Sequence, residues 1–349
     1  MRQIGLPLVF ASMVGAIACT ADRALAPTAG QAGQLNFPPA MYAAYSRTTL
    51  PGTETVTALN DSGDVVGASA SGGVLWHGAT HERISLPIIP TAIANDGAVA
   101  GSIDGHAATW KSGRVTVLDS ASSIALAICR CASATVVGSV QVNGETHAAI
   151  WVGGIRIDAG VPPNSTHAEF SSIAGGFVVG NAIVRAHDPR VGGFMDFQRP
   201  FSWSPSGGWL PLVRDGQSFL ATAKIVSLNS HGIGVGPGIE FNFPEVEGVF
   251  YDLAAGTSAP HEGDNLPLFN EIFPTGINDS LQVSETAQLA SENGPATVAL
   301  VAVQVLGSGV GPGLVLPPGV IGDQTAGINS AGIIGGQSNG LPVLWTPNP

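Results

Sequence analysis

The chain has little charge, few cysteines and no long amphipathic helical pattern. Only 11% of its 349 residues are charged and three are cysteine. A disordered chain would combine high charge with low hydrophobicity, whereas here 44% of residues are hydrophobic. With 47 glycines and 25 prolines, turns take the place of helices. The composition therefore predicts a folded, all-β chain.

Basic residues are absent from the last third of the chain. Residues 225–349 contain 11 acidic residues and no lysine or arginine, and the whole chain carries a net charge of −12. Nucleic-acid binding needs clustered basic side chains, so this balance argues against a nucleic-acid partner. We interpret the acidic sector as an aid to solubility, with a site for a cation or a basic protein as the alternative.

Residues 1–18 have the charged start and short apolar core of an export signal. They end in the run AIAC, which resembles a bacterial lipobox with alanine where leucine is usual. The resemblance implies a lipidated Cys19, and plain cleavage after Ala18 is the alternative. Residues 19–36 read as a flexible tether. We expect an exported periplasmic or cell-surface protein, anchored to the membrane by Cys19.

The remaining chain repeats one short phrase. Its clearest copy, ALNDSGDVVG at Ala58–Gly67, predicts two short strands around a turn. Further copies are AIANDGAVAG (92–101), ASATVVG (132–138), SIAGGFVVG (172–180), SLNSHGIGVG (227–236), GINDSLQVSE (276–285) and GINSAGIIGG (327–336). Seven copies predict seven similar structural units. The first glycine of the closest copies, at Gly63, Gly97, Gly232 and Gly332, is expected to supply a positive φ.

Each unit continues into a third strand that ends in an aromatic residue, and then into a fourth strand. The aromatics are Trp76, Trp110, Trp151, Trp203, Tyr251 and Trp345. One four-stranded sheet cannot cover a tryptophan, so their shared position predicts packing between stacked units. The alternative is a ring of exposed aromatics that stack on a ligand.

These features predict a single all-β propeller of about seven four-stranded blades over residues 37–349. The expected blades are 53–88, 90–119, 122–160, 166–216, 219–260, 268–320 and 322–347. The last blade lacks a fourth strand, and residues 41–52 precede the first blade as a spare one. Their run RTTLP resembles RISLP at Arg83–Pro87 in blade 1, so we expect this N-terminal strand to complete blade 7 and close the ring.

The repeated phrase, followed by H-A-x-x-W at His106–Trp110 and His147–Trp151, resembles the bacterial extracellular HAF repeat. This resemblance covers nearly the whole mature chain and implies export and a β-propeller-like fold. It carries over no catalytic residue. Blade 6 departs from the pattern, because Leu281 replaces the turn glycine and Ala296–Gly307 contains no tryptophan.

The first strands, read as VTAL, TAIA, ALAI, SSIA, IVSL, TGIN and TAGIN, contain no acidic or basic side chain. If they are innermost, the central opening holds no general acid or base, so we expect a non-enzymatic protein. His106 and His147 are interpreted as structural rather than as metal ligands. Asn60–Asp64 resembles a calcium loop without its later bidentate carboxylate, so no cofactor is expected and Ca²⁺ is the alternative.

Cys129 and Cys131 remain once Cys19 is assigned to a lipid. In an oxidising compartment they predict a small-loop disulfide, with a metal or redox role as the alternative. An i,i+2 pair in an extended strand has poor geometry for this bond, so the disulfide requires a turn.

The predicted binding surface is the loop after the second strand, which lengthens in blades 4 and 5. Its candidate residues are Arg185, His187, Asp188, Arg190, Phe194, Asp196, Phe197, Arg199, Glu240, Phe241, Phe243 and Glu245. Long loops with charge and aromatic groups favour a binding or scaffold module for a protein or glycan. A carbohydrate hydrolase or lyase that uses carboxylates of these loops is one alternative. A purely structural envelope protein, with drifting surface insertions, is another.

The Cys19 assignment is tested by intact-mass measurement of the detergent-extracted mature protein. We expect cleavage before Cys19 and a mass increase that corresponds to acyl chains, which a Cys19→Ser variant does not acquire. An unmodified Cys19 in the mature protein would contradict the lipid anchor.

Overall fold

The repeated phrase folds as two antiparallel strands, as its sequence predicted. In the computed structural model, strands β2 (Thr55–Leu59) and β3 (Val65–Ser69) flank the turn of blade 1, and β4 (Gly72–Trp76) and β5 (Arg83–Leu86) complete the sheet in the order β2-β3-β4-β5. The structure describes residues 43–69, 72–129, 135–188, 192–213, 220–240, 246–261, 269–289, 296–305, 309–310, 314–317 and 319–349.

The same order of strands recurs along the chain. Blade 2 holds β6 (Ile89–Ile93), β7 (Val99–Ile103), β8 (His106–Lys111) and β9 (Arg114–Val117); blade 3 holds β10 (Ser123–Ile128), β11 (Thr135–Val142), β12 (Glu145–Val152) and β13 (Ile155–Gly160). Blade 4 holds β14 (Ser165–Ala174), β15 (Phe177–Asp188), β16 (Gly193–Ser204) and β17 (Gly208–Pro211). Blade 5 holds β18 (Leu220–Ala223), β19 (Ser227–Leu228), β20 (Ile233–Glu240), β21 (Val246–Asp252) and β22 (Thr257–His261). Blade 6 holds β23 (Phe269–Ile277), β24 (Gln282–Leu289), β25 (Ala296–Val305), β26 (Gly309–Val310) and β27 (Leu314–Val315); β28 (Gln324–Ile328), β29 (Ile334–Ser338) and β30 (Leu341–Pro347) belong to blade 7.

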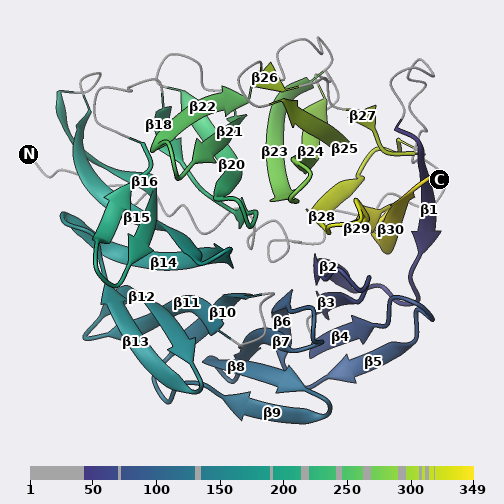
Figure 1. Cartoon of the computed structure of the whole chain (residues 1–349), viewed down its shortest axis with the longest axis horizontal. Coiled ribbons are helices and arrows are strands. Elements are labelled where there is room, and N and C mark those ends of the chain that lie inside the picture. The colour runs from purple at the N-terminus through teal and green to yellow at the C-terminus, as the bar shows by residue number, and fades with distance from the viewer. Residues whose placement is uncertain are drawn as a thin grey trace, which may run out of the picture. The chain divides into compact units, whose positions relative to one another are not determined.

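The sheets follow one another around a common centre (Figure 1). Hydrogen bonding divides the described strands into six sheets, because blades 3 and 4 share one eight-stranded sheet. Their connection is a single parallel bridge between Thr146 of β12 and His167 of β14. No helix in the described part of the chain has the length and apolar character needed to cross a membrane.

A strand from before blade 1 completes the sheet of blade 7. β1 (Tyr45–Thr49) pairs antiparallel with β30, with Arg47 opposite Trp345, and the sheet order is β1-β30-β29-β28. In blade 1, Arg83 of β5 lies opposite Trp76 in the same way. β1 thus occupies the position of a fourth strand, and β2 in turn lies against β28 and β29.

An acidic residue that precedes the first strand accompanies the outer-strand arginine. Arg83 donates to Glu54, which is 8% exposed, and Arg156 of blade 3 donates to Asp119 at 3.0 Å. Burial is the largest single influence on Glu54 and opposes its ionisation, but the hydrogen bond from Arg83, the charge of Arg83 and backbone hydrogen bonds together lower the pKa of this carboxyl. β1 therefore brings to blade 7 an arginine that other blades carry on their own fourth strand.

The structure explains why glycine stands at both recurring places in the repeated phrase, since neither place accommodates a side chain without strain. Gly63, Gly97, Gly232 and Gly332 have φ between 77° and 81°, which confirms the predicted turn conformation. At the second glycine, an added Cβ would lie 2.1 Å from the carbonyl oxygen of Ile89 at Gly101 and 2.0 Å from that of Ile124 at Gly138. The first strand bulges opposite these glycines, which brings its backbone close.

Blade 6 departs from both rules. Leu281 stands at the turn-glycine position with φ 60°, a conformation that costs a branched side chain roughly 1 kcal/mol. Glu285, a fully buried residue, replaces the second glycine. Blade 6 thus keeps the backbone path of its neighbours with a different set of side chains.

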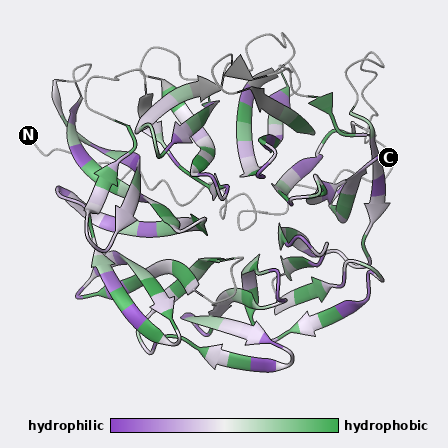
Figure 2. Cartoon of the chain, in the orientation of Figure 1, coloured by the Kyte–Doolittle hydropathy of each residue, from purple (hydrophilic) through white to green (hydrophobic). Residues whose placement is uncertain are grey.

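The third-strand aromatics form core, as their spacing predicted. Trp76, Tyr251 and Trp345 are 0% exposed and Trp151 is 1% exposed, while Trp203 is half-buried. The indole nitrogens of Trp76 and Trp345 donate to the carbonyls of Pro51 and Pro317, in the connections that enter their blades, at 2.8 and 2.7 Å. Apolar residues recur along the strands of every sheet (Figure 2), and the buried clusters mix residues of adjacent blades.

Four buried turn asparagines, which we name the asparagine ladder, join consecutive blades. Asn60 donates to Ala94 O at 3.0 Å, Asn229 to Asn278 O at 3.3 Å, Asn278 to Asn329 O at 3.0 Å, and Asn329 to Asn60 O at 3.0 Å. Each side-chain oxygen accepts backbone N–H groups of its own turn, such as Asp64 N for Asn60. One side chain therefore shapes its turn and bonds the next blade, and the last blade bonds the first.

The ladder predicts a selective loss of stability for Asn329→Ala. The change removes the bond to Asn60 O, which keeps Gly63 N as a donor, and it leaves the N–H groups of Ala331 and Ile333 without their acceptor, so we expect a loss of about 1–3 kcal/mol in the free energy of unfolding. The control is Asn95→Ala, an exposed turn asparagine that bonds Asp61 and is expected to cost less than about 1 kcal/mol. Urea unfolding measures both, and equal losses would contradict the ladder's role.

Candidate binding face

One face of the described sheets carries the connections between second and third strands, and we name it the hairpin face. Its two-residue turns include Asp104–Gly105, Asn143–Gly144 and Asn339–Gly340, all with positive φ at both residues, as in type I′ hairpins. The starts of the first strands reach the same face, since Ser123 N donates to Gly105 O at 3.0 Å. Connections of neighbouring blades are therefore available to one ligand.

The lengthened connection of blade 4 is not a loop, as the sequence suggested, but an extension of β15 and β16. The two strands pair from Val178↔Trp203 out to Asp188↔Gly193, whereas β14 follows β15 only as far as Val184. We name residues 185–188 and 193–196 the blade 4 arm. Alternating residues in this stretch favour strand, and the interpretation as a loop overlooked that pattern.

The blade 4 arm exposes both apolar and charged groups. Phe194 is 64% exposed and packs edge-on against the His187 ring, with ring centroids 5.7 Å apart. Met195 is 37% exposed. Arg185 and Asp196, both well exposed, lie opposite each other with 3.8 Å between Nη1 and Oδ1. Four of the predicted binding residues therefore meet in one small exposed region.

Phe197 and Arg199 lie at the base of the arm and form part of its support. Phe197 is only 6% exposed, so it is not the exposed aromatic that the sequence suggested. The Arg199 guanidinium lies 5.0 Å from the Phe197 ring centroid and donates to Gln198 O. Both residues fix the point from which the arm projects.

The remaining predicted residues are described in part or not at all. Asp188 ends β15 and Glu240 ends β20, so their backbone positions are known. Arg190, Phe241, Phe243 and Glu245 lie outside the described residues, as do Cys19 and Cys131. Cys129 is disulfide-bonded, and its pairing with Cys131 stays a prediction.

The interpretation that the first strands carry no titratable group is wrong, because several of these strands begin earlier than the repeated phrase. β14 starts at Ser165 and includes His167 and Glu169, and β23 includes Glu271. Lys224 lies between β18 and β19 in blade 5. Burial lowers the pKa of Lys224, and the nearby Glu169 carboxylate opposes this effect.

The first strands of several blades line a small central hollow, as expected if they are the innermost strands. Its volume is about 100 Å³, and residues of β2, β19, β23 and β28 line it together with Val226. None of its lining residues is titratable. The charged groups of β14 and the β18–β19 connection are thus separate from this hollow.

The two histidines of the H-A-x-x-W motif make structural contacts. His106 Nδ1 lies 2.9 Å from Ala121 O, in the connection to blade 3, and His147 Nδ1 lies 3.0 Å from Asp158 Oδ1 on β13. Within the described residues, no group of three or more metal-binding side chains gathers.

No protein-family model matches the chain, and no curated protein matches its sequence. Among solved structures, the chain is similar to the β-propeller domain of the Trilobed protease from Pyrococcus furiosus, with a TM-score of 0.55 and 11% identity over 84% of this chain and 94% of that one. An endo-arabinase from Bacteroides thetaiotaomicron aligns over 62% of this chain and 89% of its own, with a TM-score of 0.31 and 10% identity. The first likeness shows a β-propeller fold.

Proposed function

We propose that the protein is a closed propeller of seven blades that serves as an exported binding module. Seven sets of strands follow the repeat, and the single Thr146–His167 bridge is a contact between blades 3 and 4 rather than a fusion of them. The propeller of the Trilobed protease is described as having an open velcro topology. Here β1 pairs with β30 and Asn329 bonds Asn60, and both contacts support closure.

The blade 4 arm is the observation that carries the binding role. It exposes Phe194 on the same face as the Arg185–Asp196 pair and Met195 on the opposite face, on two strands that are paired throughout the arm. Apolar anchors with a polar rim, held by a regular element, resemble the centre of a protein interface. A macromolecular partner, protein or glycan, is therefore the proposed ligand of this region.

Location at the cell envelope is the second part of the proposal. The export signal, the AIAC run at residues 16–19 and the resemblance to the HAF repeat support it. A lipid on Cys19 followed by a tether to residue 36 would hold the propeller near a membrane while leaving its faces open to partners.

An enzymatic function is the second candidate, and the inner strands of blades 4 and 5 favour it. Lys224, its neighbour Glu169 and His167 are chemically competent groups that the sequence interpretation had missed. A lysine whose pKa is lowered by burial is a candidate base or nucleophile. A screen for polysaccharide cleavage by β-elimination, in which a base removes a proton from carbon, tests this candidate with Lys224→Met as the control variant. The candidate fails if turnover is absent or unchanged by that substitution.

The binding role is tested with a paired substitution in the arm, Phe194→Ser with Met195→Ser. Both side chains are exposed, so we expect the thermal midpoint to change little while binding to the ligand found on glycan and protein arrays weakens about tenfold or more. The matched control is Leu210→Ser, a residue of β17 that is 56% exposed and lies away from the arm. Arrays without any ligand would favour a purely structural role, and equal affinity in all three proteins would contradict binding by the arm.

A further inference from the structure

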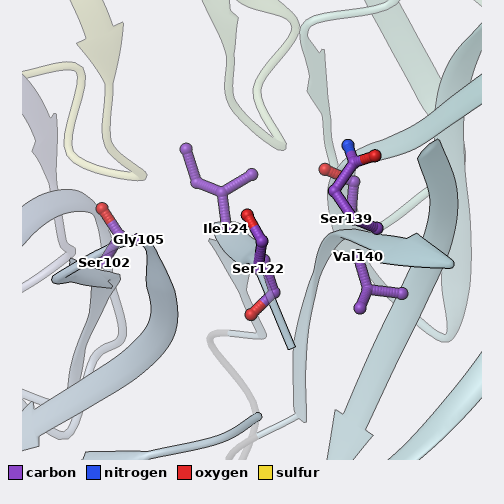
Figure 3. Close-up of a pocket in the computed structure, with 8 residues that line it drawn as sticks. Ser102, Gly105, Ser122, Ile124, Ser139 and Val140 are labelled. Atoms are coloured by element: carbon purple, nitrogen blue, oxygen red, sulfur yellow. The ribbon is translucent and has the colours of Figure 1, made fainter. Parts of the chain in front are cut away.

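A second hollow opens on the hairpin face beside the start of β10. Its volume is about 240 Å³, and it is lined by Ser102, Gly105, Ser122, Ser123, Ile124, Ser139, Val140 and Gln141. Figure 3 shows Ser122 and Ile124 between Ser102 and Gly105 on one side and Ser139 and Val140 on the other. The lining has four hydroxyl groups and one amide but no titratable side chain.

Three of the four hydroxyls have no protein hydrogen-bond partner within the described residues: those of Ser102, Ser122 and Ser139. Ser123 differs, since its Oγ accepts from Ala107 N at 2.9 Å and donates to Ala121 O at 3.0 Å. Ser139 is only 6% exposed. Ser139 Oγ is nevertheless not one of the fully buried polar atoms that lack a partner, so it reaches the hollow and can bond water or a ligand there.

The repeat shows what is unusual about Ser102 and Ser139. Both follow the second glycine of the phrase, and the equivalent residues of blades 4, 6 and 7 bond the first strand of the next blade. These bonds join Asn181 to Ile225 O at 3.0 Å, Thr325 N to Thr286 Oγ1 at 3.0 Å, and Gln337 to Thr55 Oγ1 at 3.3 Å. Ser102 and Ser139 make no such bond. Their hydroxyls therefore remain available where other blades use this position to join their neighbours.

We propose that this hollow binds a neutral polyhydroxylated ligand about the size of one sugar residue. Serine hydroxyls and a glutamine amide both donate and accept, which suits vicinal hydroxyl groups. An ion would lose its hydration here without gaining an opposite charge. Ile124 is 36% exposed and offers an apolar surface to the C–H face of a sugar ring. The volume of the hollow is below the roughly 300–1,000 Å³ of drug-sized pockets, which favours a ligand of one sugar residue.

The site lies in blades 2 and 3 and does not depend on the binding role proposed for the blade 4 arm. The full chain is titrated by ligand-observed NMR with glucose, galactose, mannose and N-acetylglucosamine, with glycerol and myo-inositol as acyclic and carbocyclic polyols, and with glucuronate as the charged counterpart of glucose. We expect saturable binding of at least one neutral compound and weaker binding of glucuronate. Comparison of the sugars with the two polyols shows which source of hydroxyl groups the site accepts.

Substitutions then place the bound compound. Ser139→Ala and Ser102→Ala each remove one hydroxyl and add no bulk, and each is expected to raise Kd about three- to tenfold. Ser85→Ala, at an exposed position on β5, is the control and should leave Kd unchanged. If the Ser139→Ala variant does not fold, the Ser102→Ala variant, at a half-buried position, decides. Failure of every neutral probe to bind, equal binding of glucuronate, or an unchanged Kd in the serine variants would overturn the proposal.

Discussion

The structure depends on how each four-stranded sheet is covered by the next. A sheet of this size has two apolar faces and cannot bury a tryptophan alone. In this chain, Trp76, Trp151 and Trp345 reach nearly complete burial because residues of an adjacent blade pack against them. The asparagine ladder adds a polar bond at the same seams and uses one side chain for both turn and neighbour. Repetition in the sequence is therefore the consequence of repeated contact between blades.

The sequence predicted most of the fold because its signals are local and repeated. The prediction used patterns that recur several times: the turn glycines, the third-strand aromatics and the resemblance of the N-terminal strand to a fourth strand. One unclear copy of the repeat therefore did not change the predicted fold. The site was predicted less well. The charged and aromatic composition of the blade 4 arm indicated a binding surface. Its strand structure was not predicted, because charged residues interrupt the apolar pattern in this stretch.

The errors at the inner strands have a different origin. The repeated phrase begins at SSIA in blade 4 and predicts a short first strand, whereas β14 also includes Glu169 and His167 upstream of the phrase. The length of β14 is set by its pairing with β15, which is itself longer than the repeated phrase. The repeat therefore does not predict where β14 begins. Ser102 and Ser139 were also missed, because serine in a strand carries no signal of its own. Only comparison with Asn181 in the same register shows that a bond between blades is absent.

The pairing of β1 with β30 joins two segments that lie far apart in the sequence. Most contacts within a blade join residues close in sequence, whereas Ser46 bonds Asn348 across 302 positions. Contacts between residues so far apart in sequence form slowly, because the chain must lose the entropy of the long loop before the contact stabilises it. Sheets of consecutive strands can thus form from local hairpins, whereas the sheet of β28, β29 and β30 gains β1 only through this distant contact. Because β1 also supplies Arg47, which bonds Ser338 at 2.5 Å, its arrival completes a polar network as well as a sheet edge. β1 therefore adds to the sheet of β28, β29 and β30 the same kinds of contact that other sheets obtain from a strand close in sequence.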